Sequence, residues 1–143
     1  HEEFKIFHPG GNIGARLRTV DEIMRTGEEL PVIDPETDIF EVLLRMSEKC
    51  IGCTAVTDEK GTLIGIITDG DIRRNLQVEP SLRSSKAIEL MSKDPKVIQE
   101  GGLAHQALSI ITNNKITTLF VVNAENKLLG AIHMHDLLRL GVI

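Results

Sequence analysis

Tryptophan and tyrosine are absent from this chain, and phenylalanine occurs only four times. So few aromatic rings leave little surface on which single-stranded bases can stack. The formal net charge of −5 also lacks the basic footprint that general nucleic-acid binding requires. The composition therefore argues against a nucleic-acid partner.

Long hydrophobic runs and a cysteine framework are missing too. No apolar stretch approaches the roughly 20 residues that span a bilayer, so we expect no membrane partner. Two cysteines cannot form a disulfide scaffold, which favours a reducing, cytoplasmic location. The 143 residues are 41% hydrophobic and 26% charged. These values are typical of a globular chain that forms one domain or two half-domains with a shared core.

The chain contains an internal repeat. Residues 32–74 align without a gap with residues 97–139, so that each aligned pair lies 65 positions apart. The identical pairs are Val32/Val97, Ile33/Ile98, Leu43/Leu108, Ile51/Ile116, Val56/Val121, Leu63/Leu128, Gly65/Gly130, Ile67/Ile132, Asp71/Asp136 and Arg74/Arg139. We expect a feature found in both copies to serve the fold, and a feature found in one copy to be incidental or functional.

Each copy predicts a β-α-β-β-α unit, preceded by a short amphipathic segment that ends in methionine. The opening segments and strands are residues 20–24, 32–33, 54–57 and 63–68 in the first copy, and 87–91, 97–98, 119–122 and 128–133 in the second. One unit cannot cover the apolar face of its own sheet. We therefore predict an α/β (α+β) fold in which the two units pack sheet to sheet.

The helices are predicted from caps and from apolar spacing. Asp38 and Glu41 resemble a capping box at the start of the first helix. Its apolar face comprises Ile39, Val42, Leu43 and Met46, and the corresponding face of the second copy comprises Ala104, Ala107, Leu108 and Ile111. A last helix is predicted to begin at Asp69 in one copy and Met134 in the other.

The sharpest motif is Gly65-Ile-Ile-Thr-Asp-Gly-Asp71, in which a strand ends in a hydroxyl and a carboxylate follows in the first turn of a helix. We expect its glycine to let a neighbouring chain approach closely. Such a carboxylate can accept both hydroxyls of a ribose, and the helix N-terminus can receive phosphate. Helix capping by Thr68 and Asp71 explains the same residues. The second copy keeps the carboxylate at Asp136 but has His133 in place of the hydroxyl, which favours a ligand over capping alone.

Two cysteines form the pattern Cys50-Ile-Gly-Cys53. A zinc site needs further ligands at suitable spacing, and the other copy has lysine and threonine at the aligned positions. A thioredoxin-type motif belongs at a helix start after a strand, whereas this one joins a helix to a strand. We predict no redox or metal function for it.

His133 and His135, next to Asp136, allow a metal site or an anion site. Alternate residues share a face of an extended strand, but the strand is predicted to end here. Histidine at a helix N-terminus can instead donate to phosphate or carboxylate. We predict no metal and favour the anion.

The tandem β-α-β-β-α unit that closes on Gly-x-x-[Ser/Thr]-x-x-Asp resembles a cystathionine-β-synthase (CBS) domain pair, also called a Bateman module. The resemblance covers about residues 20–143. It implies a regulatory sensor of adenine nucleotides. Three further segments, His8-Pro-Gly-Gly-Asn-Ile-Gly14, residues 68–74 and residues 133–139, resemble the C-terminal part of the D-arabinose 5-phosphate isomerase family. That family begins the pathway to the lipopolysaccharide sugar Kdo.

The resemblance implies a domain order. Residues 1–19 are a remnant of the isomerase domain with a linker, residues 20–80 are the first CBS repeat, and residues 81–143 are the second. His8 corresponds to a catalytic residue of the family, whose other catalytic residues belong to the absent isomerase domain. General acid–base catalysis needs such neighbours, so we expect this fragment not to be an enzyme.

The resemblance also implies two nucleotide pockets shared across the pair, with no required cofactor. One joins Thr68 and Asp71 with Val97, Thr117 and Thr118, and the other joins His133 and Asp136 with Val32, Gly52, Cys53 and Thr54. The ligand is AMP or ATP, or the activated end product CMP-Kdo acting by feedback. The carboxylate of that product requires cations, which His133, His135, Arg73 or Arg74 can supply.

A structural role is the alternative. The pair then binds no ligand and serves only to assemble the isomerase, as a homodimer of the pair and a tetramer of the parent. Ile72, Leu76, Leu137, Leu138 and Leu140 predict an apolar edge through which two copies associate by their helices into a flat disc.

Overall fold

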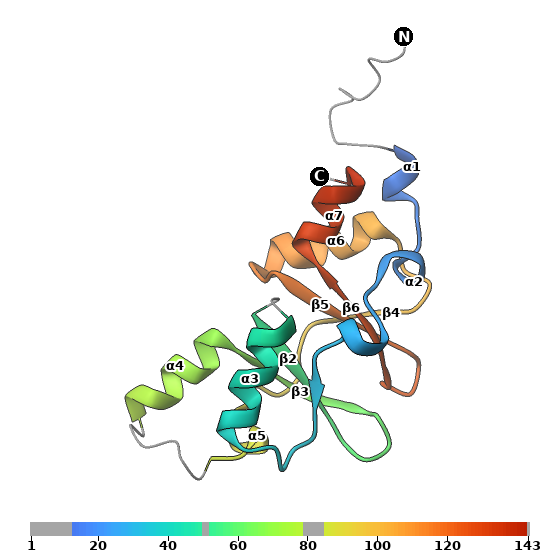
Figure 1. Ribbon diagram of the computed structural model, residues 1–143. Coiled ribbons are helices and arrows are strands. Elements are labelled where there is room, and N and C mark those ends of the chain that lie inside the picture. The colour runs from blue at the N-terminus through green and yellow to red at the C-terminus, as the bar shows by residue number, and fades with distance from the viewer. Residues whose placement is uncertain (1–12, 50–51, 79–84, 143) are drawn as a thin grey trace. The chain divides into compact units, whose positions relative to one another are not determined.

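The computed structural model describes residues 13–49, 52–78 and 85–142, which divide into two compact units (Figure 1). The β1–β3 unit comprises Gly27–Pro95 with Ala124–Leu128. The β4–β6 unit comprises the described parts of His1–Thr26, Lys96–Asn123 and Leu129–Ile143. The units thus interleave along the chain. The domain borders expected after residues 19 and 80 concern the sequence repeat and remain a prediction.

The β1–β3 unit is built on a three-stranded sheet in the order β1-β2-β3. Strand β1 (Val32–Ile33) runs parallel to β2 (Cys53–Thr57), which is antiparallel to β3 (Leu63–Thr68). Helix α3 (Ile39–Lys49) connects β1 to β2, and α4 (Asp69–Val78) follows β3. Asp38 caps α3 as predicted, because its carboxylate accepts the Glu41 N–H at 3.0 Å.

The β4–β6 unit repeats this plan with the sheet order β4-β5-β6. Its elements are β4 (Val97–Gln99), α6 (Ala104–Asn114), β5 (Thr118–Val122), β6 (Leu128–His133) and α7 (Met134–Leu140), with the short helix α1 (Ile13–Arg16) added. Helices α3 and α6, strands β2 and β5, and strands β3 and β6 begin 65 residues apart. The predicted β-α-β-β-α repeat is confirmed.

Aligned residues of the two copies fill the two cores. The buried pairs include Ile33/Ile98, Val42/Ala107, Val56/Val121 and Ile67/Ile132. The predicted apolar face of α3 is right for Ile39, Val42 and Met46, which are buried, but wrong for Leu43, which is 43% exposed. Leu43 lies instead beside the exposed Phe40 and Leu44. Spacing placed Leu43 on the stripe, but burial depends on how far the sheet extends beneath the helix.

The two copies exchange their opening segments. Helix α2 (Val20–Ile23) opens the first copy but lies in the β4–β6 unit, where Arg25 and Ala131 exchange backbone hydrogen bonds of 2.8 and 3.1 Å. Helix α5 (Ala87–Leu90) opens the second copy but lies in the β1–β3 unit, where Ser92 and Ile66 exchange bonds of 2.8 and 3.0 Å. Each sheet is therefore extended by the other copy's segment.

Gly65 and Gly130 make this exchange possible. A Cβ at Gly65 would overlap the sulfur of Met91, and a Cβ at Gly130 would overlap the sulfur of Met24. The expectation that this glycine admits a neighbouring chain is confirmed in both copies. The methionine that ends each opening segment is the residue that occupies the space.

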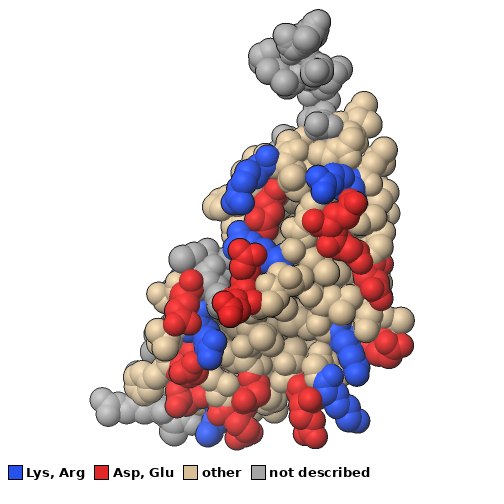
Figure 2. Space-filling model, turned by 45° about the vertical axis from the view of Figure 1, so that its right-hand side comes forward, with Lys and Arg blue, Asp and Glu red and all other residues tan. Residues whose placement is uncertain are grey.

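Two of the five residues of the predicted apolar edge are not at the surface. Ile72 and Leu137 are buried in the unit cores, while Leu138 is exposed, and the side chain of Leu76 lies outside the described residues. On the face shown in Figure 2, acidic and basic side chains are interspersed and form no continuous basic patch among the described residues. None of the helices that the structure describes is both long and apolar enough to cross a bilayer.

Candidate functional site

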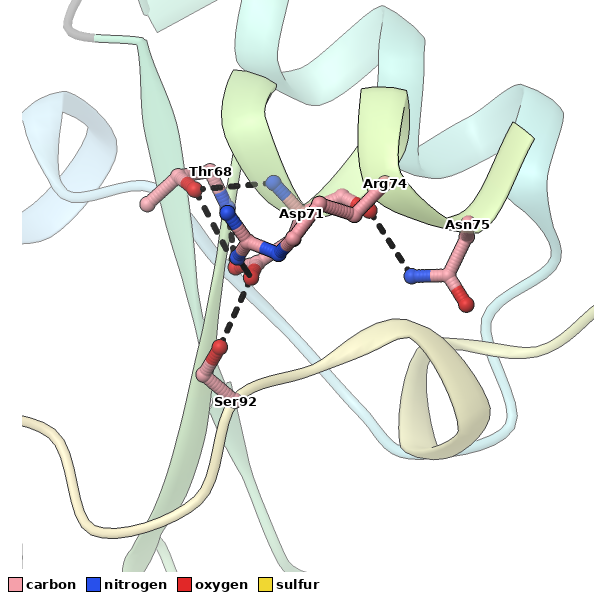
Figure 3. Close-up of polar contacts among 5 residues, drawn as sticks. All are labelled: Thr68, Asp71, Arg74, Asn75 and Ser92. Atoms are coloured by element: carbon pink, nitrogen blue, oxygen red, sulfur yellow. Dashed lines mark hydrogen bonds and ion pairs between the residues drawn. The ribbon is translucent and has the colours of Figure 1, made fainter. Parts of the chain in front are cut away.

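The junction of β3 and α4 places Thr68 and Asp71 in a reciprocal cap (Figure 3). The backbone N–H and the hydroxyl of Thr68 donate to Asp71 Oδ2 at 2.9 and 3.1 Å. The Asp71 N–H donates in return to Thr68 Oγ1 at 3.1 Å. Asp71 is only 4% exposed. The capping that the sequence allowed is therefore present, and it uses the oxygen that points back to the strand.

The other oxygen of Asp71 binds two further side chains (Figure 3). The Ser92 hydroxyl, from the residues after α5, donates to Asp71 Oδ1 at 2.7 Å. Arg74 forms an ion pair with the same oxygen, although the Arg74 side chain is 68% exposed. The amide of Asn75 donates to the Asp71 carbonyl at 2.7 Å. This carboxylate is thus surrounded mainly by hydroxyls and by one solvated arginine.

The junction of β6 and α7 holds Asp136 differently. The His133 N–H donates to Asp136 Oδ2 at 3.0 Å, which repeats the backbone half of the cap. Arg25 binds the carboxylate in a bidentate manner. Its Nε donates to Oδ2 at 3.1 Å and its Nη2 donates to Oδ1 at 3.0 Å. Arg139 is more distant, at 4.0 Å, and is 73% exposed. A charge-assisted bidentate pair therefore replaces the two hydroxyls.

His133 serves as the helix cap that Thr68 provides in the other copy. Its Nδ1 accepts the His135 N–H at 3.0 Å, so this nitrogen carries no proton. Burial lowers the pKa of His133 below its usual 6.5, and the neighbouring His135 and Arg25 lower it further. The expectation that His133 offers positive charge to an anionic ligand is wrong for this arrangement. The ring is neutral near pH 7 and acts as an acceptor.

The surroundings of Asp136 favour its ionised form. Burial would raise the pKa of this carboxyl, but hydrogen bonds from Arg25 and from the His133 backbone outweigh burial. The pKa consequently lies below its usual value. The Arg25–Asp136 pair is a permanent ion pair over the physiological pH range.

The remaining predicted residues gather at the same end of each sheet. In the β1–β3 unit, Cys53 lies opposite Thr68 in the strand register, and Gly52 precedes it with φ +74°. Thr54 is fully buried, whereas Val32 is 38% exposed. Each of these residues lies in the unit of Asp71.

The β4–β6 unit gathers its predicted residues in the corresponding way. Thr118 begins β5 and is buried, and the Thr117 carbonyl accepts the Met134 N–H at 2.8 Å. Val97 begins β4. These three lie in the unit of Asp136. The expected pockets combine residues from both units and remain a prediction.

Two surface cavities lie near these groups. A cavity of about 310 Å³ in the β1–β3 unit is lined by Val32, Ile33, Asp34, Thr37, Glu41, Arg45 and Thr57. A cavity of about 210 Å³ in the β4–β6 unit is lined by Arg18, Glu22, Ile23, Asp136, Arg139 and Leu140. Only Val32 and Asp136 among these residues were predicted from the sequence as site residues.

Sequence reasoning missed Arg25 and Ser92, the two residues that complete the carboxylate networks. A signal was present, because each directly follows the methionine that ends an opening segment, and the two are 67 positions apart. This offset differs from the 65 of the main repeat, so the gap-free alignment did not pair them.

The sequence pattern of the CBS domain matches residues 20–78 and 87–142. The chain belongs to the CBS domain family. Among proteins of known structure, it is similar to CBSX2 from Arabidopsis thaliana in complex with AMP, at 25% identity and a TM-score of 0.73 over 85% of this chain and 93% of that one. The CBS domain pair of protein MJ0100, in complex with 5′-methylthioadenosine and S-adenosyl-L-methionine, shares the fold at 21% identity, with a TM-score of 0.75 over 87% of this chain and 95% of that one.

Among curated proteins, this CBS pair is similar to arabinose 5-phosphate isomerase KdsD of Pseudomonas aeruginosa. The two are 42% identical over 143 residues, which cover 99% of this chain and 44% of the relative. KdsD of Escherichia coli is 36% identical over a similar share. The chain spans less than half the length of the curated relatives that it matches.

Two further predictions fall partly or wholly outside the described residues, namely those for His8 and for Cys50. Cys53 is buried at the start of β2. The rings of His133 and His135 lie 4.5 Å apart between centroids. Within the described residues, His, Cys, Asp and Glu side chains form no group of three suited to a metal ion.

Proposed function

We propose that this chain is the regulatory, nucleotide-binding CBS pair of an arabinose 5-phosphate isomerase of Kdo biosynthesis. The observation that carries the proposal is the similarity to KdsD, which extends over 99% of the chain at 42% identity. The remaining length of that relative leaves room for the isomerase domain, which we propose as the covalent partner of this module. A cytoplasmic location follows from the same proposal.

The ligand that fits the site is a nucleotide whose ribose binds a carboxylate of the Gly-x-x-[Ser/Thr]-x-x-Asp motif. The AMP complex of CBSX2 supports an adenine nucleotide. CMP-Kdo is the alternative ligand, because an end product that inhibits the first enzyme of its pathway limits its own synthesis. Its sugar carboxylate requires a cation, and Arg73 or Arg74 now suits this role better than the neutral His133.

Calorimetric titration of the chain with AMP, ATP, CMP and CMP-Kdo tests the proposal. We expect one of these ligands to bind, and Asp71→Ala to weaken it. Asp69→Ala is the matched control, since Asp69 is an exposed carboxylate in the same first turn of α4. Absence of binding by all four ligands, or equal binding by the parent and Asp71→Ala, contradicts a nucleotide sensor that uses this motif.

The parent activity is proposed to reside outside this chain. Only His8 corresponds to the catalytic set of the isomerase family, and acid–base catalysis needs its other members. The purified chain should therefore show no isomerisation of arabinose 5-phosphate. Turnover by a preparation that is free of host enzyme contradicts this assignment.

A structural assembly module is the second candidate, and helix α3 favours it. Phe40, Leu43 and Leu44 are 64%, 43% and 52% exposed, whereas the aligned positions of α6 hold His105, Leu108 and Ser109. An exposed apolar stripe on one helix suits contact with a second copy. Antiparallel pairing of α3 with the partner's α3 about a two-fold axis at Leu43 brings Glu41 opposite the partner's Arg45.

Sedimentation analysis tests whether the chain is such an assembly module. We expect a dimer at micromolar concentration, and we expect Leu44→Glu to dissociate it. Ser109→Glu, at the aligned position of α6, is the control that should leave the dimer intact. A monomeric parent rules out assembly through α3, and a dimer that binds no nucleotide favours the structural role.

A further inference from the structure

Arg25 and Ser92 occupy equivalent places in the two units. Each follows the methionine of an exchanged opening segment, and each bonds through its backbone to the strand that carries the motif, Arg25 to Ala131 and Ser92 to Ile66. Each also donates through its side chain to the carboxylate at the start of the next helix. The units therefore present the same backbone frame, with a different residue at this position and with His133 in place of Thr68 in the motif.

Asp71 is held by partners that a ligand can replace. A carboxylate has about four acceptor positions, and those of Asp71 receive the Thr68 N–H, the Thr68 hydroxyl, the Ser92 hydroxyl and Arg74. Two of these donors are neutral hydroxyls that can rotate away. Arg74 is mostly solvated, so its ion pair contributes little. Ribose hydroxyls can take the places of the two protein hydroxyls, donor for donor.

Asp136 is held by a partner that a ribose cannot match. Arg25 occupies a position on each oxygen, and its side chain is 23% exposed beside an Asp136 side chain that is 10% exposed. A charge-assisted bidentate pair in this setting is stronger than two neutral hydrogen bonds. A ribose that displaces Arg25 would also leave a guanidinium without its counter-ion. The His133 N–H occupies a further position on Oδ2.

We infer that residues 25 and 92 decide which carboxylate is available to a nucleotide: Ser92 leaves Asp71 open to ribose, and Arg25 closes Asp136. Arg25 is thus a specificity-determining residue that acts by occupying the carboxylate. This inference rests on the proposed nucleotide-binding function and adds that the pair has one working ribose site. Exchanging the two residues should exchange the properties of the sites.

The test uses AMP as the probe and calorimetry for affinity and stoichiometry. The parent should bind AMP at one class of site. Arg25→Ser should open a second class whose affinity is at least roughly tenfold higher than any second site of the parent. The double variant Arg25→Ser/Asp136→Ala should lose that second class again. Arg139→Ser is the matched control, because Arg139 lies 4.0 Å from the same carboxylate and is solvated.

The reciprocal variant keeps the test decisive if Arg25→Ser does not fold, which circular dichroism shows. Ser92→Arg should weaken the Asp71 site by roughly tenfold. An NMR titration adds a readout without ligand, since Arg25→Ser should raise the pKa of Asp136. Loss of AMP binding in Arg25→Ser shows that Arg25 contacts the ligand and overturns the inference. AMP binding that neither exchange alters also overturns it, while the proposed function stands. If neither the parent nor any variant binds a nucleotide, the proposed function fails and this inference with it.

Discussion

The carboxylates Asp71 and Asp136 share a position in the repeat, a backbone frame and an exposed fraction below one-tenth, yet their surroundings differ. Asp71 accepts hydrogen bonds from two hydroxyls, whereas Asp136 forms a bidentate ion pair with Arg25. The difference arises at two positions, namely Ser92 against Arg25 in the exchanged segments and Thr68 against His133 in the motif. The two copies therefore keep the geometry of the motif, while one residue inside it and one residue outside it change its chemistry.

The largest effect should come from removing Arg25. Arg25→Ala leaves the charge of Asp136 largely buried and without its ion-pair partner, which should lower the free energy of unfolding by about 3 kcal/mol. Ser92→Ala removes one neutral hydrogen bond and should cost about 1 kcal/mol. Urea unfolding monitored by circular dichroism measures both. Equal costs would remove the distinction between the two sites.

Substitutions at the paired glycines should destabilise the two units by similar amounts. Gly65→Ala and Gly130→Ala each force a methyl group against a methionine sulfur, and each should cost about 2 kcal/mol. A double variant with the shorter Val in place of the facing methionine, Met91 or Met24, should recover part of the loss. Very unequal losses in thermal unfolding would show that the two segments are not packed alike.

The carboxylates should differ in nucleotide affinity. Asp71→Ala leaves ribose hydroxyls without an acceptor, which corresponds to roughly 1–3 kcal/mol or about a 5- to 150-fold loss. Asp136→Ala should change AMP affinity less, because Arg25 already occupies that carboxylate. Calorimetry with each variant provides the measurement. If Asp136→Ala has the larger effect, the assignment of the open site is reversed.

The sequence was sufficient to predict the repeat, the order of elements and the two carboxylates, because periodicity and motif spacing are local signals. It also anticipated the role of Gly65 and Gly130. The partner of Asp136 was not predictable by local pattern, since Arg25 lies 111 residues away along the chain. Burial was the second failure. Ile72 and Leu137 looked like an apolar edge, but they turn inward, and only contacts with distant segments decide that orientation.

The smallest effect should be a pH dependence confined to the copy with histidine. Because the pKa of His133 in the folded chain lies below 6.5, the unfolded chain binds a proton at higher pH than the folded chain does. The free energy of unfolding should decline as the pH falls below about 6.5, and level off below the folded pKa. Protonation of Nδ1 would also break the hydrogen bond that this nitrogen accepts from the His135 N–H.

The matched variant is His133→Thr, which copies Thr68. This substitution should reduce the decline in the free energy of unfolding, measured with urea, between pH 7.5 and pH 5. The variant keeps the other histidines, such as His105 and His135. Charged neighbours of the ring, Arg25 and Asp136, remain in the variant. An identical pH profile for the parent and the variant contradicts the capping role of the neutral ring.

The exchange of opening segments has a consequence for synthesis on the ribosome. The β1–β3 unit receives Ser92 soon after its own strands have emerged, and it lacks only the turn at Ala124–Leu128. The β4–β6 unit depends on residues from both extremes of the chain, since Arg25 must wait for Asp136. Within this module, the segment that is synthesised first is thus among the last to find its place, and its apolar residues stay unprotected until the end of the module has been made.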